Sequence, residues 1–101
     1  MKTYSILISP EAKADVEDFF KHICFVYKQP LQAVRNRIDL YQALEGLSFY
    51  ADSIAVSQSN YIQSRFGPAA RCINHKKMTV IYVVYGDYVY VKRVVHSALI
   101  H

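Results

Sequence analysis

Apolar residues follow two different spacings along this chain, and the change from one to the other predicts the order of its secondary structure. Residues 3–8 form a short run that suits a strand, residues 69–74 suit a second, and two runs rich in β-branched and aromatic residues follow. Between them, residues 10–27 and 30–47 repeat apolar side chains every three or four positions, as helices do. The predicted order is strand, helix, helix and three strands, in a single domain at 1–101.

Both predicted helices begin at recognisable signals. Ser9 can accept a hydrogen bond from the first turn, Pro10 suits the first helical position, and Glu11 complements the positive end of the helix. Gln29 and Pro30 separate this helix from the next, because the residue before a proline avoids helical geometry. So short a link predicts an antiparallel helix hairpin.

Each predicted helix carries an apolar stripe, which we expect to cover one face of the sheet. In the first helix the stripe consists of Ala12, Val16, Phe19, Phe20, Ile23, Val26 and Tyr27. In the second helix it consists of Leu31, Val34, Ile38, Tyr41 and Leu44. Gly46 is expected near the C-terminal cap of the second helix.

The strongest local signal is the two-residue link Gly86-Asp87 between two strand-like runs, which is typical of a tight β-hairpin. If these two residues form the loop, the register of the hairpin follows from it. The predicted pairs are Tyr85 with Tyr88, Val83 with Tyr90, Ile81 with Lys92 and Lys77 with His96.

Because side chains alternate across a strand, this register divides the final hairpin into two faces. One is almost wholly apolar and is expected in the core: Met78, Val80, Tyr82, Val84, Val89, Val91, Arg93 and Val95. The other mixes aromatic, basic and aliphatic residues: Lys77, Thr79, Ile81, Val83, Tyr85, Tyr88, Tyr90, Lys92, Val94 and His96. We expect the helix hairpin to cover the first face and the second to stay open to a polyanion or a partner chain.

Residues 48–68 show no regular spacing, and their serine-rich composition suggests a loop, or a short extra turn before Gly67-Pro68. The predicted fold class is therefore α+β. It is a two-layer β-α-α-β-β-β arrangement, with a helix hairpin packed on one face of a mostly antiparallel sheet.

Composition narrows the possible functions only slightly. The formal net charge of +4 and the pI of about 9.1 favour an anionic partner, either nucleic acid or an acidic protein.

Cys24 and Cys72 lack a metal-binding spacing and are expected as reduced thiols in the cytoplasm. Three glycines exclude a glycine-rich phosphate loop, no apolar run could cross a membrane, and the start suits a strand rather than a signal peptide. We expect no cofactor, no metal and no membrane association.

Basic residues gather near one end of the predicted sheet, and three of them suggest a catalytic site. His96 could transfer protons near neutral pH, while Lys77 and Arg71 stabilise the charge that develops at phosphorus during metal-free RNA cleavage. The alternative is a solvated strand end with ordinary polar residues.

The layout and several local patterns together resemble the RelE/ParE toxin family of bacterial type II toxin–antitoxin modules. The opening from Tyr4 to Phe19 looks like the start of that family, where a strand ends in a small residue and enters a helix. Arg71 matches the arginine often found on the strand before the last hairpin. The final hairpin looks like the last two strands of the family, whose recurrent residues are matched by Tyr82, Arg93 and His96. The resemblance covers the chain except for residues 48–64.

This resemblance implies a neutralising antitoxin that wraps the toxin, and one of two targets. RelE-like members cleave messenger RNA in the ribosomal A site, whereas ParE-like members poison DNA gyrase and are not nucleases. Thr79 stands where the mRNA-cleaving branch carries a catalytic arginine, and residues 97–101 are too few for the C-terminal residues of that branch unless His101 substitutes for one of them. These departures favour the ParE-like, plasmid-stabilisation branch. An mRNA endonuclease using Lys77, His96 and Arg71, or a non-toxic interaction module, remains as an alternative.

The mixed face of the final hairpin is the predicted partner-binding surface, through Tyr85, Tyr88, Tyr90 and Lys92. Arg93, from the other face, completes the predicted partner-binding residues. Left bare, this face would expose a large apolar patch. An antitoxin helix or strand is expected to cover it, and a second copy of the chain is the alternative occupant. For Arg93 the competing interpretation is an internal bond to a backbone carbonyl or to an acidic residue such as Glu45 or Asp39.

Overall fold

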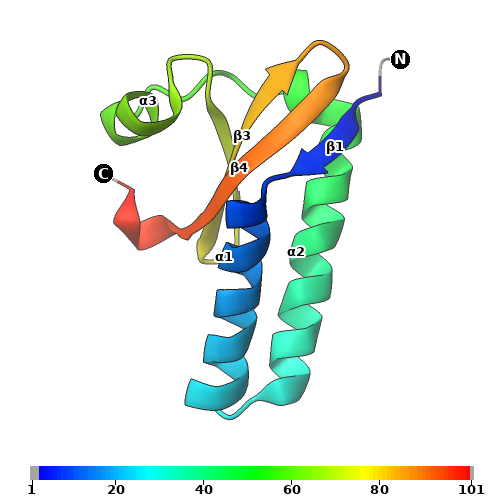
Figure 1. The fold of residues 1–101 in the computed structure, drawn as a ribbon, viewed down its shortest axis with the longest axis vertical. Helices are drawn as coiled ribbons and strands as arrows, with labels where there is room; N and C mark the ends of the chain where they lie inside the picture. The colour runs from blue at the N-terminus through cyan, green and yellow to red at the C-terminus, as the bar shows by residue number, and fades with distance from the viewer. Residues whose placement is uncertain (1–2, 101) are drawn as a thin grey trace.

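The computed structural model describes residues 3–100, apart from the side chain of Leu99, and combines a sheet with a helix hairpin (Figure 1). Its strands are β1 (Ser5–Ile8), β2 (Arg71–His75), β3 (Met78–Tyr85) and β4 (Tyr88–His96). Its α-helices are α1 (Pro10–Lys21), α2 (Pro30–Tyr50) and α3 (Asn60–Phe66). Shorter helical turns are the π-type η1 (His22–Val26) and the 3-10 turns η2 (Ala51–Ser53) and η3 (Ser97–Leu99).

The strand order in the sheet is β1-β4-β3-β2, with β1 parallel to β4 and the other neighbouring strands antiparallel. Helices α1 and α2 run side by side as a hairpin that packs on one face of the sheet and extends beyond it (Figure 1). The predicted α+β fold, a helix hairpin on a mostly antiparallel sheet, is confirmed.

The main core lies between the helix hairpin and the sheet. Its most buried members are no more than 2% exposed: Ala12, Val16, Leu40, Leu44 and Leu47 from the helices, and Val80, Tyr82, Val89, Val91 and Val94 from the sheet. Burying one such valine or leucine contributes about 1.5–3 kcal/mol. This layer therefore supplies most of the attraction between the two parts of the fold.

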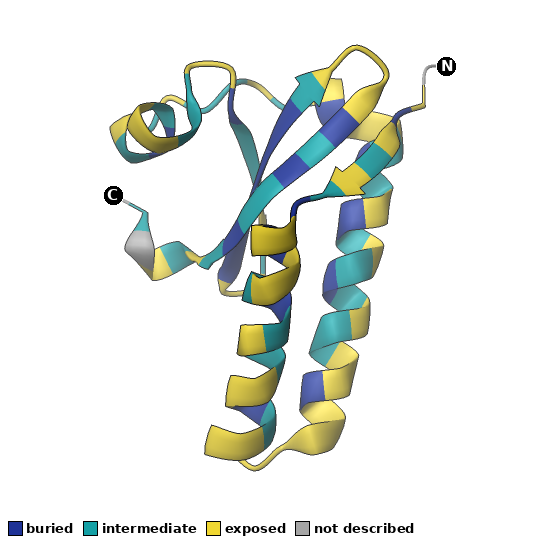
Figure 2. Cartoon of the chain, viewed as in Figure 1, coloured by how far each residue is buried: buried dark blue, intermediate teal, exposed yellow. Residues whose placement is uncertain are grey.

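The apolar stripe predicted for the second helix is wrong, except at Leu44 and in part at Tyr41. Leu31 and Ile38 are exposed, and the helix instead buries Ala33, Leu40, Leu44 and Leu47. The two sets lie about half a helical turn apart. Helix α2 therefore carries apolar residues on both sides, and Figure 2 shows its exposed residues on the edge away from α1.

The second helix also continues beyond its predicted end. It runs to Tyr50 rather than to Leu47, so Gly46 lies inside the helix and not at its cap. A Cβ added at Gly46 would lie 3.3 Å from Cε1 of Tyr50, so the tyrosine ring lies over the glycine.

A β-bulge shifts the register in the middle of the final hairpin. On the loop side the predicted pairs are confirmed: Tyr85 with Tyr88, and Val83 with Tyr90. Between Ile81 and Tyr82 the register slips, so Ile81 pairs with Arg93 and not, as predicted, with Lys92. Lys92 is the extra residue of β4, and an inserted residue cannot be foreseen from the loop alone.

The bulge exchanges the two faces of β4 beyond it, because one extra residue reverses the alternation of side chains. Val94, predicted for the open face, lies in the main core, whereas Arg93 and Val95 lie on the opposite side. His96 consequently pairs with Met78 and not with Lys77.

The second face of the sheet was predicted to be open, and this is wrong. Helix α3 and the C-terminal segment cover part of it. The cover forms a second buried cluster of Ile62, Ala70, Ile81 and Val83. Residues 48–68, expected as a loop or a short turn, supply α3, whose N-cap Ser59 accepts a hydrogen bond from the Ile62 N–H at 3.4 Å.

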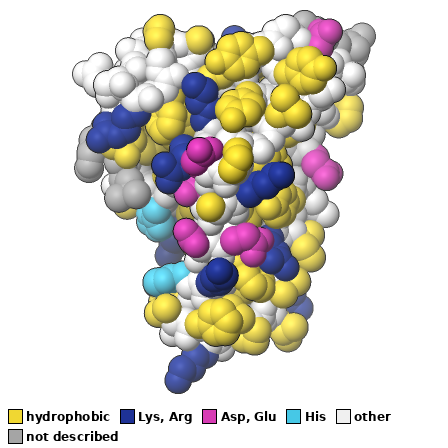
Figure 3. Space-filling model, in the orientation of Figure 1, with side chains coloured by type: hydrophobic (Ala, Val, Ile, Leu, Met, Phe, Trp, Pro, Cys, Tyr) yellow, Lys and Arg dark blue, Asp and Glu magenta, His cyan; other side chains and the backbone are white. Residues whose placement is uncertain are grey.

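The tip of the final hairpin remains uncovered. Tyr85 and Tyr88, which flank the Gly86-Asp87 loop, are 57% and 51% exposed. Figure 3 shows hydrophobic side chains gathered over this upper part of the molecule, near the β3–β4 loop and β1.

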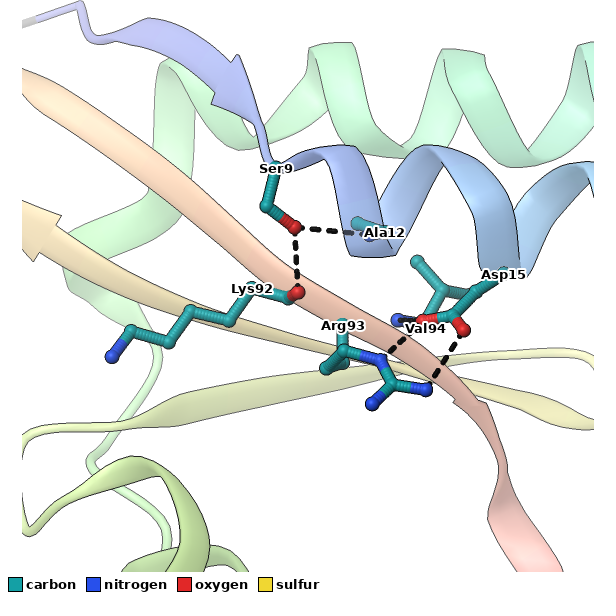
Figure 4. A network of polar contacts seen from close by, with 6 residues as sticks. All are labelled: Ser9, Ala12, Asp15, Lys92, Arg93 and Val94. Atoms are coloured by element: carbon teal, nitrogen blue, oxygen red, sulfur yellow. Dashed lines mark hydrogen bonds and ion pairs between the residues drawn. The ribbon is translucent and has the colours of Figure 1, made fainter.

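The start of α1 is attached to the free edge of β4. Strand β1 pairs with β4 only as far as Ile8 opposite Val91, after which the chain turns into α1. The Ser9 N–H donates to the carbonyl of Val91 at 3.0 Å. The Ser9 hydroxyl donates to the Lys92 carbonyl at 2.7 Å and accepts from the Ala12 N–H at 2.9 Å (Figure 4). The predicted capping role of Ser9 is confirmed.

Further along α1, Asp15 completes this attachment. Its carboxylate accepts hydrogen bonds from the Arg93 guanidinium at 2.7 and 2.9 Å and from the Val94 N–H at 3.0 Å (Figure 4). The side chain of Asp15 is 15% exposed, which shields the pair partly from water. The hydrogen bond to Asp15 raises the pKa of Arg93 above its usual value. Arg93 thus has an acidic partner inside the chain, but it is neither Glu45 nor Asp39.

Replacing Asp15 by alanine should lower the free energy of unfolding by about 2–3 kcal/mol, because charge-assisted hydrogen bonds are lost and the Val94 N–H loses its acceptor. Urea denaturation followed by circular dichroism measures this loss. The matched control is Glu17→Ala, which removes an exposed carboxylate paired with Arg37 and should cost below about 1 kcal/mol. Equal losses in the two variants would contradict the role assigned to Asp15.

Candidate functional site

A cavity of about 540 Å³ lies between the helix hairpin and the turn that joins β2 to β3. We call it the hairpin cavity. Its walls are apolar where the helices meet, at Phe19, Ile23 and Tyr27. Its polar groups are His22, Gln29, Gln32, Asn36, Lys76, Lys77 and His96. The cavity therefore combines two lysines, two histidines and neutral amides, supplied by segments far apart in the sequence.

The β2–β3 turn places both lysines beside the cavity. Lys76 and Lys77 form the two-residue link between the strands. Lys76 has a φ of +56°, a left-handed conformation that residues other than glycine seldom adopt. Its Nζ donates to Asn36 Oδ1 and to Asp39 Oδ2, each at 3.0 Å, which holds the turn against α2.

His96 lies at the end of β4, on the same side of the cavity as the turn. Its Nδ1 accepts a hydrogen bond from the Ala98 N–H at 3.2 Å, so the neutral ring carries its proton on Nε2. The Ser97 N–H donates to the Lys77 carbonyl at 2.8 Å, which keeps the two strand ends together. Lys77 and His96 therefore line one cavity, although they are not a cross-strand pair.

Arg71, the third predicted catalytic residue, does not line this cavity. It begins β2, roughly 13 Å along the strand from the end that enters the turn. Its guanidinium donates to the carbonyls of Asp52 at 3.0 Å and Ile54 at 2.7 Å. Arg71 thus anchors the segment that follows α2, and the structure brings together two of the three predicted residues.

Thr79 occupies the position where the resemblance places a catalytic arginine in the mRNA-cleaving branch. It is buried, its hydroxyl donates to Asn74 Oδ1 at 2.8 Å, and its oxygen lies 2.8 Å from Ser97 Oγ. It is not among the residues that line the hairpin cavity. No cationic group from this position faces the candidate site.

The hairpin cavity is suited to an anionic group. None of the described residues that line it carries a carboxylate, and Lys77 brings positive charge, whereas the charge of Lys76 is offset by its ion pair with Asp39. Lysines, amide donors and histidines bind phosphate or carboxylate oxygens. In a phosphoryl reaction His96 could transfer a proton while Lys77 stabilises the developing charge.

The predicted partner-binding residues differ in how exposed they are. Tyr85 and Tyr88 are exposed at the hairpin tip, and Tyr90 is half-buried beside a shallow hollow that also includes Leu7 and Lys13. The remaining two lie at the bulge. Lys92 is half-buried there, and the Arg93 guanidinium is held by its ion pair within the chain.

Sequence reasoning missed the helix residues of the cavity. His22, Gln32 and Asn36 come from η1 and α2, and no spacing in the sequence connects them with the β2–β3 turn. The ring of His22 meets that of Tyr27 edge to face, with centroids 5.0 Å apart. These contacts depend on how the two helices cross, which local patterns do not encode.

The described part of the chain shows neither a metal site nor a membrane-spanning helix. Among residues 3–100, no group of three or more His, Cys, Asp or Glu side chains is arranged to hold a metal ion. In the same part of the chain, no helix is both long and apolar enough to cross a bilayer.

Comparisons with known proteins identify the fold. No family model matches the sequence, and no curated protein does. Among solved structures, a chain of the chromosomal ParDE TA system from P. aeruginosa superposes with a TM-score of 0.78 at 19% identity, covering 93% of this chain and 96% of that one. A chain of the toxin–antitoxin complex RelBE2 from Mycobacterium tuberculosis gives 0.61 at 13% identity, covering 93% and 98%. The expected RelE/ParE-like fold is confirmed.

Tyr82, the recurrent tyrosine of the resemblance, lies in the core and not in the cavity. Its hydroxyl donates to the Ala51 carbonyl at 2.8 Å, which ties β3 to the end of α2. Burial raises its pKa to about 12, although the charge of Arg71 acts in the opposite direction. Tyr82 and Arg71 therefore both hold the segment after α2.

Tyr82 should make stability depend on pH above 10. An unfolded tyrosine ionises near pH 10, whereas folded Tyr82 keeps its proton until about pH 12. Between these values the unfolded state binds fewer protons, so stability falls by about 1.4 kcal/mol per pH unit from this residue. The stability advantage of wild type over Tyr82→Phe, measured by urea denaturation, should therefore shrink between pH 9 and pH 11. An unchanged difference would contradict the assignment.

Proposed function

We propose that this chain is the toxin subunit of a bacterial type II toxin–antitoxin module of the plasmid-stabilisation kind, ParE-like in its target. It acts in the cytoplasm by binding and inhibiting DNA gyrase, without a cofactor, and a cognate antitoxin neutralises it. The observation that carries this proposal is the fold shared with a chain of the ParDE system over 93% of this chain.

Two features of the candidate site support the ParE-like choice. Thr79 is buried in a polar cluster where an mRNA-cleaving relative would need an arginine. Arg71, the other cation that such chemistry would use, is bonded to the carbonyls of Asp52 and Ile54. A nuclease would thus lack two of its positive charges at the reacting phosphate.

Both the fold and the exposed surface support an antitoxin as the partner. The RelBE2 structure is described as a toxin–antitoxin complex. In this chain, Tyr85 and Tyr88 remain exposed beside the β3–β4 loop, with Tyr50 exposed at the end of α2. Large aromatic side chains of this kind are enriched at protein interfaces.

A ribosome-dependent mRNA endonuclease is the second candidate, and one observation favours it. The hairpin cavity places Lys77 and His96 together in a site that suits phosphate. In this mechanism His96 transfers the proton and Lys77 stabilises the phosphorane, while Arg71 remains too far away to help.

Controlled expression in a bacterial host distinguishes these functions, with primer extension on abundant transcripts and a DNA-damage reporter in the same culture. We expect growth arrest with a damage response and intact transcripts. The double variant Lys77→Ala with His96→Ala should arrest growth as wild type does, because gyrase inhibition does not need these residues. The control Lys13→Ala removes an exposed lysine on α1, outside the hairpin cavity.

Two other results would overturn the proposal. Codon-periodic cuts in translated messages that vanish in the double variant, but persist in Lys13→Ala, would establish the endonuclease. Normal growth with the wild-type chain would leave a non-toxic interaction module. A supercoiling assay with purified gyrase tests the preferred target directly. The purified chain should inhibit supercoiling, and the antitoxin should reverse that inhibition.

A further inference from the structure

The outer side of α2 carries a row of exposed apolar residues that the fold leaves without a partner. Leu31 is 74% exposed, Ile38 50% and Phe49 62%. Their spacing of seven and eleven residues places all three on one side of α2. The helix forms one side of the molecule, and its exposed residues lie along the edge away from α1 (Figures 1 and 2). Single exposed apolar residues are ordinary, but a row of them along one helix marks an interaction surface.

The spacing of this row is that of a coiled-coil seam. Six exposed positions follow one another at alternating intervals of four and three residues: Leu31, Arg35, Ile38, Gln42, Glu45 and Phe49. Such a 3-4 spacing keeps one stripe of a helix facing a second helix along its whole length. We call this stripe the α2 seam. Leu31 and Phe49 lie at the two ends of the seam, Arg35 and Glu45 come next, and Ile38 and Gln42 lie at its centre.

The α2 seam is complementary to itself when a second copy runs antiparallel. Pairing centred on residue 40 places Leu31 opposite Phe49, Arg35 opposite Glu45, and Ile38 opposite Gln42, each pair occurring twice. A parallel pairing would instead bring Arg35 against Arg35 and Glu45 against Glu45, which repel. Within residues 3–100, neither Arg35 nor Glu45 forms an ion pair inside the chain.

We propose that the α2 seam binds the same seam of a second copy of this chain in an antiparallel helix pair. Two Leu31–Phe49 contacts close the ends, two Arg35–Glu45 ion pairs set the direction, and Ile38 packs on the aliphatic part of Gln42 at the centre. This surface differs from the mixed face of the final hairpin, for which a second copy is the alternative occupant. The inference does not depend on the proposed function.

Sedimentation equilibrium of the purified chain tests for this dimer. The chain is measured over roughly 1–100 μM, because a small seam with polar layers should dissociate in that range. Cell-free synthesis supplies the protein without exposing a host to it. Wild type should pass from monomer to dimer with concentration. Glu45→Arg places two arginines opposite each other twice, and should weaken association at least about tenfold; Arg35→Glu should do the same.

The charge-swapped double variant Arg35→Glu with Glu45→Arg restores both ion pairs, so its dissociation constant should return to within about threefold of wild type. Melting curves of all variants should match, because both positions are exposed. A chain that stays monomeric, a dimer indifferent to single charge reversal, or a loss that the double variant does not recover would each overturn the proposal.

Discussion

The attachment of α1 to the edge of β4 is the interaction on which the rest of the fold depends. Beyond Val91, β4 has no strand beside it on that edge, and buried backbone groups need partners. Ser9 and Asp15 supply them, by bonding the carbonyls of Val91 and Lys92 and the N–H of Val94. These bonds fix the start of α1 against β4. Helix α2 then packs beside α1 on the same face of the sheet.

The β-bulge at Lys92 makes this attachment compatible with the core. It turns Val94 inward, and turns Arg93 to the side where it can reach Asp15. It also moves His96 one position along β3, to the end beside the Lys76-Lys77 turn. The inserted residue thus decides how His96 reaches the hairpin cavity, whose other lining residues come from the helix hairpin and the β2–β3 turn.

Helix α2 shows why periodicity alone picked the wrong stripe. Apolar residues occur on two sides of it, and the stripe with Leu31 and Ile38 matches helical spacing as well as the one with Leu40 and Leu47. Periodicity reports that a face is apolar but not what covers it. The small Ala33 allows close approach on the inner side, whereas Leu31 and Ile38 on the outer side remain exposed.

The sequence by itself determined the order of the strands and of the two long helices, though not α3. It also determined the Ser9 cap, the Gly86-Asp87 loop and the pairs next to that loop, because each depends on residues close together in the chain. It also singled out Lys77 and His96, which do share a cavity. Only the tertiary structure decided the bulge, the partner of Arg93, the anchoring role of Arg71, and the helix residues of the cavity. Each of these depends on packing between segments distant in sequence, where the choice among several local possibilities is made by the core as a whole.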